Sequence, residues 1–334
     1  MVGNGIKEGQ LQPYPQHPPE TIERLALRLI QNGLRDVDQA TLELRLEQVG
    51  YFRLKGYWYP FLTPIHPQSE KRALPFREGT SFNDIWCRYE FDQELRTLVF
   101  DGIVTIEIYL KNFLASELSS FGGEFGYLNR SGLPNLGFDE YLECLRALRE
   151  SYKKSRLPYL MHFKHTYNNP LPPYWMIVGC LSYGTLKQYL YEGSTEEIKR
   201  KLAIKFRIFN TNSRPEIQGD IKILSQWLEV IRQARNMVAH HDRFWNESSN
   251  RIAPKLPHHR SGAHAQQWWG NDWNTLRTSK GPAAFLTMEQ YILKQINGAS
   301  WSKRFIALMD RYPQIPISDM GFPKDWQTMS LWSE

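Results

Sequence analysis

Residues 232–246 hold the side chains of this chain that are best suited to chemistry on a phosphate group. The segment reads RQARNMVAHHDRFWN and brings arginine, histidine and amide side chains to the end of an otherwise apolar stretch. An imidazole transfers protons near neutral pH, and guanidinium groups hold a charged phosphate. Together they can cleave a phosphodiester bond without a metal ion. The segment is therefore the candidate catalytic site.

A helix must position this segment. At ~100° per residue, Asn236 and His240 are neighbours on one side of that helix, whereas Arg235 falls within the apolar face. A buried guanidinium needs a carboxylate partner. We expect Asp101 or Glu107 to supply it, or Arg235 to reach a cleft shared with a second subunit. The apolar face consists of Leu224, Trp227, Leu228, Ile231, Ala234 and Val238.

Other interpretations of the segment stay open. Arginines near the C-terminus of a helix favour its dipole without any catalysis. The sequence also leaves open which of Arg232, Arg235 and Arg243 faces a phosphate. His241 and Asp242 are similar to the metal-binding pair of HD phosphohydrolases, an enzyme class that needs further histidine and aspartate ligands. The sequence offers no convincing set of such ligands.

A second segment, residues 151–167, combines positive charge with aromatic rings. It contains two histidines and several aromatic residues, and no acidic residue occurs from 151 to 173. Cations interleaved with aromatic rings are typical of single-stranded RNA paths, where phosphates are neutralised and bases stack. A solvated helix end followed by a loop is the alternative. The cations of this segment are Lys153, Lys154, Arg156 and Lys164.

A third group of cations, Arg53 and Lys55, lies among four aromatic residues, Tyr51, Tyr57, Trp58 and Tyr59. So many aromatic residues in one short stretch favour core packing. Contact with RNA is the alternative for these two cations.

The hydrophobic pattern predicts a mainly α-helical protein. Apolar residues at steps of three and four predict one long helix, capped by Thr80 or Ser81 and ending near Ser119. Its stripe consists of Phe91, Leu95, Leu98, Val99, Ile103, Ile106 and Leu110. Further helices are expected at 20–33, 39–49, 138–152, 172–191, 195–206, 214–240, 284–296 and 301–312. Residues 50–60, aromatic and interrupted by glycine, predict a strand or turn, and residues 64–79 and 246–281 predict loops.

These elements suggest how the chain is divided. We expect a helical core over residues 80–246, preceded by an irregular arm over 1–19 and a small helical subdomain over 20–65. A loop insertion and C-terminal helices would follow over 247–334. A chain of 334 residues with 41% apolar content can bury a core of this size.

Composition narrows the class of protein. The 41 Lys and Arg against 35 Asp and Glu give a net charge of +6, compatible with a nucleic-acid partner and also common among other proteins. The cysteines Cys87, Cys144 and Cys180 are too widely spaced for a metal knuckle or a disulfide framework, which favours a reducing cytoplasm. The start of the chain has no pattern of a signal peptide. No stretch reaches the roughly 18 apolar residues of a membrane span.

Several stretches of the chain also resemble one known family. They are GYFRLKGYWYPF at 50–61, YEFDQELR at 89–96, PPYWM at 172–176, SYG at 182–184, RNMVAHHDRFWN at 235–246 and MGFPKDW at 320–326. In this order they resemble the Abi-like (AbiD/AbiF) abortive-infection family of bacterial phage-defence proteins. The resemblance runs from about residue 20 to the end of the chain.

The resemblance implies a HEPN-like helical bundle and a metal-independent endoribonuclease without a cofactor. Arg235, Asn236 and His240 would then be the active-site residues of an Arg-x4-His motif. Two copies of the chain would form a homodimer with a composite site. Cleavage would leave 2′,3′-cyclic phosphate ends. A catalytically silent RNA-binding scaffold is the alternative.

The family also implies supporting positions and a partner. Asp92, Arg96 and Glu107 would be polar positions on the long helix, with His241 and Arg243 beside the motif. Lys111 departs from the arginine that many relatives carry. The histidine-rich loop at 257–265 has no counterpart in the family and suggests an insertion. A structured non-coding RNA would bind and restrain the protein, as in a toxin–antitoxin pair.

Overall fold

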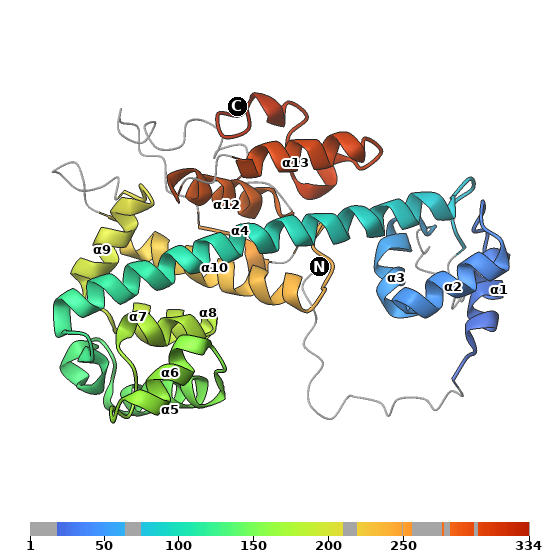
Figure 1. The fold of residues 1–334 in the computed structure, drawn as a ribbon. Coiled ribbons are helices and arrows are strands. Elements are labelled where there is room, and N and C mark those ends of the chain that lie inside the picture. The colour runs from blue at the N-terminus through green and yellow to red at the C-terminus, as the bar shows by residue number, and fades with distance from the viewer. Residues whose placement is uncertain are drawn as a thin grey trace, which may run out of the picture. The chain divides into compact units, whose positions relative to one another are not determined.

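Helices form the regular secondary structure of this protein. The computed structural model describes residues 19–63, 75–209, 219–248, 250–255, 276, 281–296 and 300–333. Within these ranges there are helices and isolated β-bridges but no strand, which confirms the mainly α fold class. The predicted arm at 1–19, the loops at 64–79 and 246–281 and the start of the 214–240 helix lie largely outside the described residues. The chain divides into two compact units, Met1–Glu90 and Phe91–Glu334, within helix α4 (Figure 1).

The smaller unit begins with two capped helices, α1 (Ile22–Gln31) and α2 (Gln39–Val49). Thr21 Oγ1 accepts the N–H of Arg24 in the first turn of α1 at 3.3 Å, and Asp38 accepts the N–H of Thr41 in the first turn of α2 at 2.8 Å. The two helices pack against each other. Their buried side chains are Ala26, Leu29, Leu42 and Leu46.

The strand or turn expected at 50–60 is wrong, because this stretch forms helix α3 (Tyr51–Trp58) and the short 3-10 helix η1 (Tyr59–Phe61). Gly50 has a φ of 86°, so the chain ends α2 and begins α3 without a loop. The side chains of Leu54, Tyr57 and Trp58 share one buried face. Their burial outweighs the weak helix propensity of aromatic residues and of Gly56. Core packing is thus confirmed for Tyr57 and Trp58, whereas Tyr59 is exposed.

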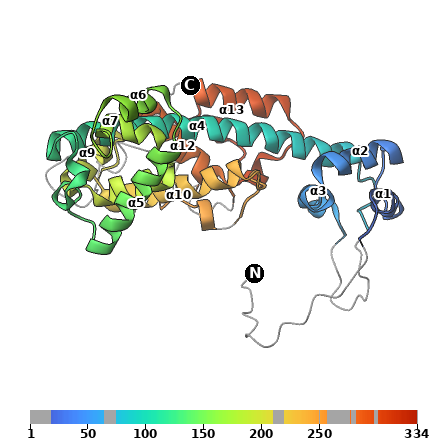
Figure 2. The same cartoon turned by 60° about the horizontal axis from the view of Figure 1, so that its bottom comes forward.

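The long helix α4 (Phe82–Gly122) matches the predicted helix closely. Ser81 Oγ accepts the N–H of Asn83 at its start, at 3.2 Å. In the larger unit, every residue of the predicted apolar stripe is buried. The larger unit is a helical bundle around this part of α4 (Figure 2).

After α4 come the 3-10 turns η2 (Gly126–Leu128) and η3 (Arg130–Gly132), then α5 (Phe138–Lys154) and α6 (Pro158–Thr166). The single helix expected at 172–191 is wrong, since the chain breaks at Leu181 and Ser182, whose backbones are extended. Ser182 Oγ accepts the N–H of Thr185 at 3.1 Å and so caps the start of a new helix. The pieces are α7 (Tyr174–Ile177), η4 (Val178–Cys180), α8 (Tyr183–Thr185) and the π-helix η5 (Leu186–Tyr191).

Helices α9 (Glu196–Lys205) and α10 (Ile221–Ala239) follow, and α10 runs beside α4 (Figures 1 and 2). Two tyrosines from the broken 172–191 stretch fasten α10. The buried Tyr183 hydroxyl donates to the carbonyl of Leu228 at 3.1 Å, and the Tyr191 hydroxyl lies 2.8 Å from Ser225 Oγ. These contacts hold the middle of α10 in place.

The C-terminal part contributes η6 (Asn250–Ile252), α12 (Ala283–Ile296), α13 (Ser300–Arg311), η7 (Ile317–Met320) and η8 (Trp326–Thr328). Trp301 Nε1 donates to the Leu98 carbonyl at 3.1 Å, so α13 packs on α4. In α12, Glu289 is fully buried, and its carboxylate oxygens have no hydrogen-bond partner among the described residues. Burial, and then the nearby Asp101, raise the pKa of Glu289 well above its usual range. Among the described residues, the helices are too short or too polar to span a membrane.

Candidate active site at the end of helix α10

Helix α10 carries the candidate site on a well-buried base. Asp220 caps its first turn by accepting the N–H of Ile223 at 3.0 Å. All six residues of the predicted apolar face are buried, which confirms the prediction that they share one face of the helix. Arg235 and Asn236 lie half-buried in the last turns, and His240 is the exposed C-cap residue.

The helix ends in a Schellman motif just after His240. The N–H of His241 donates to the Val238 carbonyl at 3.2 Å, and the N–H of Asp242 donates to the Met237 carbonyl at 2.9 Å. His241 has a φ of 61°, the left-handed region that glycine usually occupies at this position. The helix therefore ends at His240, as predicted, and the left-handed backbone of His241 makes the sharp turn that follows.

Asp92 anchors the chain beyond that turn. Its buried carboxylate accepts the N–H of Trp245 at 2.7 Å and the N–H of Phe244 at 3.1 Å. Arg96, one turn further along α4, donates to the same carboxylate. Three donors around one buried carboxylate fix the position of this segment against α4. The residues alone gave one signal of this role, an Asp and an Arg four positions apart next to buried stripe positions.

Two arginines of α10 differ in their surroundings. Arg232 donates to the carboxylate of Glu229 through both Nε and Nη2, at 2.6 to 3.1 Å. This interaction, together with those of Gln233 and Lys187, lowers the pKa of Glu229 to about 2. By contrast, Arg235 Nε is buried and has no hydrogen-bond partner among the described residues. Arg232 is therefore committed to structure, and Arg235 is the arginine left available for a ligand.

The expectation that Asp101 or Glu107 would pair with Arg235 is wrong. Asp101 pairs with Arg304 of α13. Glu107 pairs with Lys111, one turn along α4, at 2.8 Å. Asp101 and Glu107 thus find their partners on α13 and on α4 itself, which a helical wheel of α10 could not reveal.

The described part of the chain contains no set of side chains that could bind a metal ion. No group of three or more His, Cys, Asp and Glu side chains is arranged there to hold an ion. His241 and Asp242, the pair considered for an HD phosphohydrolase, belong to the helix-ending turn. Arg243 is half-buried beside them. The histidine-rich loop at 257–265 lies outside the described residues.

The basic segment at 151–167 forms the end of α5 and all of α6, a helix that the sequence did not predict. Lys153, Lys154 and Arg156 are exposed, and Lys164 is half-buried. Part of this segment lines a cavity of about 380 Å³ between the two helices. The other predicted RNA-binding cations, Arg53 and Lys55, are exposed on α3 of the smaller unit.

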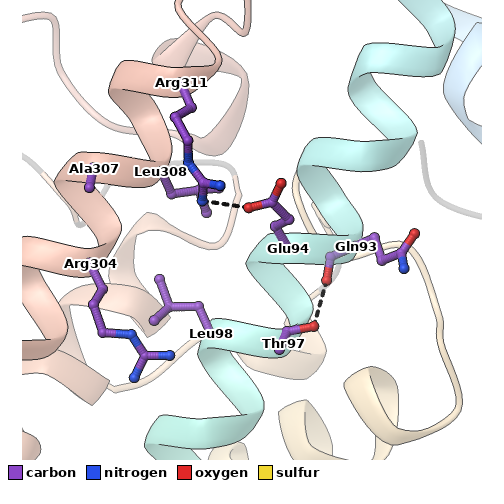
Figure 3. A pocket seen from close by; sticks show the side chains of 8 residues that line it. All are labelled: Gln93, Glu94, Thr97, Leu98, Arg304, Ala307, Leu308 and Arg311. Carbon is purple, nitrogen blue, oxygen red and sulfur yellow. Dashed lines mark hydrogen bonds and ion pairs between the residues drawn. The ribbon is translucent and has the colours of Figure 1, made fainter.

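A second cavity, of about 370 Å³, lies between α4 and α13 (Figure 3). Its cations are neutralised. Arg311 pairs with Glu94 at 2.5 Å, and Arg304 pairs with Asp101. The Tyr312 hydroxyl also donates to Glu94, at 2.7 Å. Because its charges are already paired, this cavity lacks a site for an anion.

The sequence comparisons identify the family of this chain. No curated protein and no solved structure matches it. Residues 45–246 match the Abi-like protein family, a range that covers well over half of the chain and includes α4, α10 and the whole candidate site. The ending at 320–326 lies beyond that range. The chain therefore belongs to the Abi-like protein family, as the resemblance of its sequence predicted.

Proposed function

We propose that this protein is a metal-independent endoribonuclease of HEPN type that acts in abortive infection against phage. Family membership supports the defence role. The observation that carries the catalytic part is Arg235, whose buried Nε has no hydrogen-bond partner among the described residues. Buried donors normally have partners, so an open one on the helix that ends at the exposed His240 suits a ligand that supplies the missing acceptor.

The chemistry follows from the three residues of the motif. RNA supplies its own nucleophile, the 2′-hydroxyl, and His240 takes or returns the proton. Arg235 stabilises the charge on the phosphorane-like transition state, and Asn236 orients the imidazole or the phosphate. The 2′-oxygen forms a bond to phosphorus as the bond to the 5′-oxygen breaks. The products are a 2′,3′-cyclic phosphate and a 5′-hydroxyl.

A homodimer forms part of this proposal. At ~100° per residue, the side chains of Arg235 and His240 leave α10 about 140° apart. One helix therefore presents them toward different directions. A second copy of the chain brings His240 of one subunit toward Arg235 of the other, so that each composite site is complete. A structured non-coding RNA bound to the dimer would restrain cleavage in the absence of phage.

The test compares wild-type protein with the His240→Ala variant. Both are stripped of co-purifying nucleic acid and incubated with total RNA in EDTA, and the ends of the products are mapped. We expect wild type to cut and the variant to lose at least about a hundredfold of the rate. Sedimentation of both proteins checks the dimer, and thermal unfolding checks that the variant is folded.

Three other outcomes would contradict the proposal. Equal cleavage by the two proteins would remove His240 from the site. A requirement for metal would favour the phosphohydrolase alternative with His241 and Asp242. A discrete, intact bound RNA with no cleavage by the stripped wild type would favour the RNA-binding scaffold.

A further inference from the structure

The cavity between α5 and α6 is lined by cations and by no acidic residue. Its lining consists of Arg149, Tyr152, Lys153, Arg156, Met161, Lys164, His165 and Pro170. Arg149, Lys153 and Arg156 are exposed and have no ion-pair partner among the described residues. Arg149 lies outside the basic segment found in the sequence, one turn before Lys153 on α5. It faces the same cavity because residues four apart on a helix are neighbours.

Lys164 builds the cavity. Its ammonium group donates to the carbonyl of Ser155 at 3.0 Å and to that of Lys153 at 3.4 Å. These carbonyls belong to the C-terminal end of α5, where the helix dipole is negative. Lys164 covers that end, so the partial negative charge does not oppose an anion in the cavity. The side chain also ties α6 to α5, which fixes the spacing of the remaining cations.

The tyrosine ring that lines the cavity is occupied, and the exposed Tyr159 and Tyr167 of the segment lie outside the lining. The ammonium group of Lys164 lies 4.7 Å from the ring centroid of Tyr152, which is buried. Phe163 is buried, and the ring of Tyr167 packs against it with centroids 5.0 Å apart. Single-stranded RNA gains much of its affinity from bases stacked on open rings. The cavity lining therefore offers charge for phosphates and no open tyrosine ring for stacked bases.

We propose that this cavity binds the phosphodiester backbone of folded, double-stranded RNA, at a site distinct from the end of α10. A duplex presents more phosphates per unit length than a single strand, and its bases are closed to stacking. Three exposed cations around a cavity without acidic residues can bind the phosphates of such a duplex. Contacts to phosphates do not distinguish one base sequence from another. The proposal rests on RNA being the nucleic acid that the protein engages, as proposed above, and it does not require cleavage.

The test measures binding of a labelled RNA hairpin to the full chain carrying His240→Ala, by fluorescence anisotropy at several KCl concentrations. A pocket variant replaces the exposed cavity cations by glutamine: Arg149→Gln, Lys153→Gln and Arg156→Gln. A control variant makes the same change of charge at exposed lysines outside the cavity: Lys205→Gln, Lys303→Gln and Lys324→Gln. All substitutions lie on the surface, and circular dichroism confirms that each variant is folded.

We expect the pocket variant to raise the Kd about tenfold or more and to reduce the slope of log Kd against log salt by about two to three. The control variant should raise the Kd less than about threefold. Hairpins of unrelated sequence should bind equally well. Equal losses in the two variants, or tighter binding of an unstructured strand of equal length, would overturn the proposal. Failure of wild type to cleave RNA, with the pocket effect intact, would remove the nuclease and leave this site standing.

Discussion

The two halves of the segment from Arg235 to Asn246 are held by the protein in opposite ways. The second half is fastened, because the N–H groups of Phe244 and Trp245 both donate to the buried carboxylate of Asp92. The first half carries an exposed His240 and an Arg235 whose Nε has no hydrogen-bond partner in the described ranges. The turn at His241 separates the two halves.

This difference separates two tasks within one segment. The fastened half sets the position of the chain, and the open half keeps its polar groups available for a ligand. A site needs both, since reacting groups lose effectiveness when their support is loose. Substitutions in the two halves should therefore change different measurable quantities.

The largest effect should come from the arginine of the open half. We expect Arg235→Gln to lower the cleavage rate by about a hundredfold or more, because the transition state loses its charged donor. Arg232→Gln is the matched control, since that arginine is bound to Glu229, and it should lower the rate less than about threefold. Initial rates on a labelled RNA give both numbers. If the two variants lose activity equally, the difference drawn between the arginines fails.

Removing the contacts of the fastened half should lower the stability of the fold. Asp92→Ala leaves the buried guanidinium of Arg96 and two backbone N–H groups without their acceptor. We expect the free energy of unfolding to fall by about 3–5 kcal/mol. Chemical denaturation measures it, with Asn236→Ala of the open half as the control that should cost less than about 1 kcal/mol. A small cost at Asp92 would mean that the segment is held by other contacts.

A substitution in the turn between the halves should change the free energy of unfolding only slightly, and should raise it. Glycine adopts the left-handed conformation of His241 without strain, so His241→Gly should raise the free energy of unfolding by about 0.5–1 kcal/mol. His241→Ala removes the same ring but keeps the backbone cost, and it should give no gain. A loss of stability in the glycine variant would show that contacts of the imidazole outweigh the strain.

The smallest effect concerns acid stability. A carboxyl group whose pKa falls on folding adds stability above its ordinary pKa of 4.5, and that stability is lost as the pH falls towards 2. Arg232→Gln should therefore destabilise the protein above pH 4.5, by less than about 1 kcal/mol because the pair is partly exposed to solvent. The difference from wild type should vanish near pH 2. Arg235 has no carboxylate partner among the described residues, so the stability lost in Arg235→Gln should not depend on pH in this way.

Periodicity in the sequence predicted the parts of the fold that depend on one helix at a time. The apolar stripes of α4 and α10 follow from spacing alone, and both are buried as expected. Helix α3 escaped prediction because its stability comes from the packing of Tyr57 and Trp58, which propensity does not include. The break at Leu181 escaped because Gly179 and Gly184 flank it within an otherwise apolar stretch, and an isolated glycine is tolerated within a helix.

The candidate site shows the same limit. Asn236 and His240 could be placed as neighbours from helical geometry. The pairing of Arg232 with Glu229 agrees with their spacing of three residues on a helix. The missing partner of Arg235 among the described residues could not be predicted, since it depends on Asp101 and Glu107 pairing elsewhere. The role of Asp92 links positions 152 residues apart, a separation at which local spacing carries no information.

That separation has a consequence for the order of events during synthesis. A ribosome completes α4 long before it reaches Phe244. Until then, Asp92 of the nascent chain lacks the backbone N–H groups that donate to it in the folded protein. Closing a loop of this length is slow compared with the formation of single helices. Truncated or unfinished chains that end before Phe244 lack the anchored turn. The anchored turn beside the candidate site therefore cannot form until synthesis has passed Phe244 and Trp245.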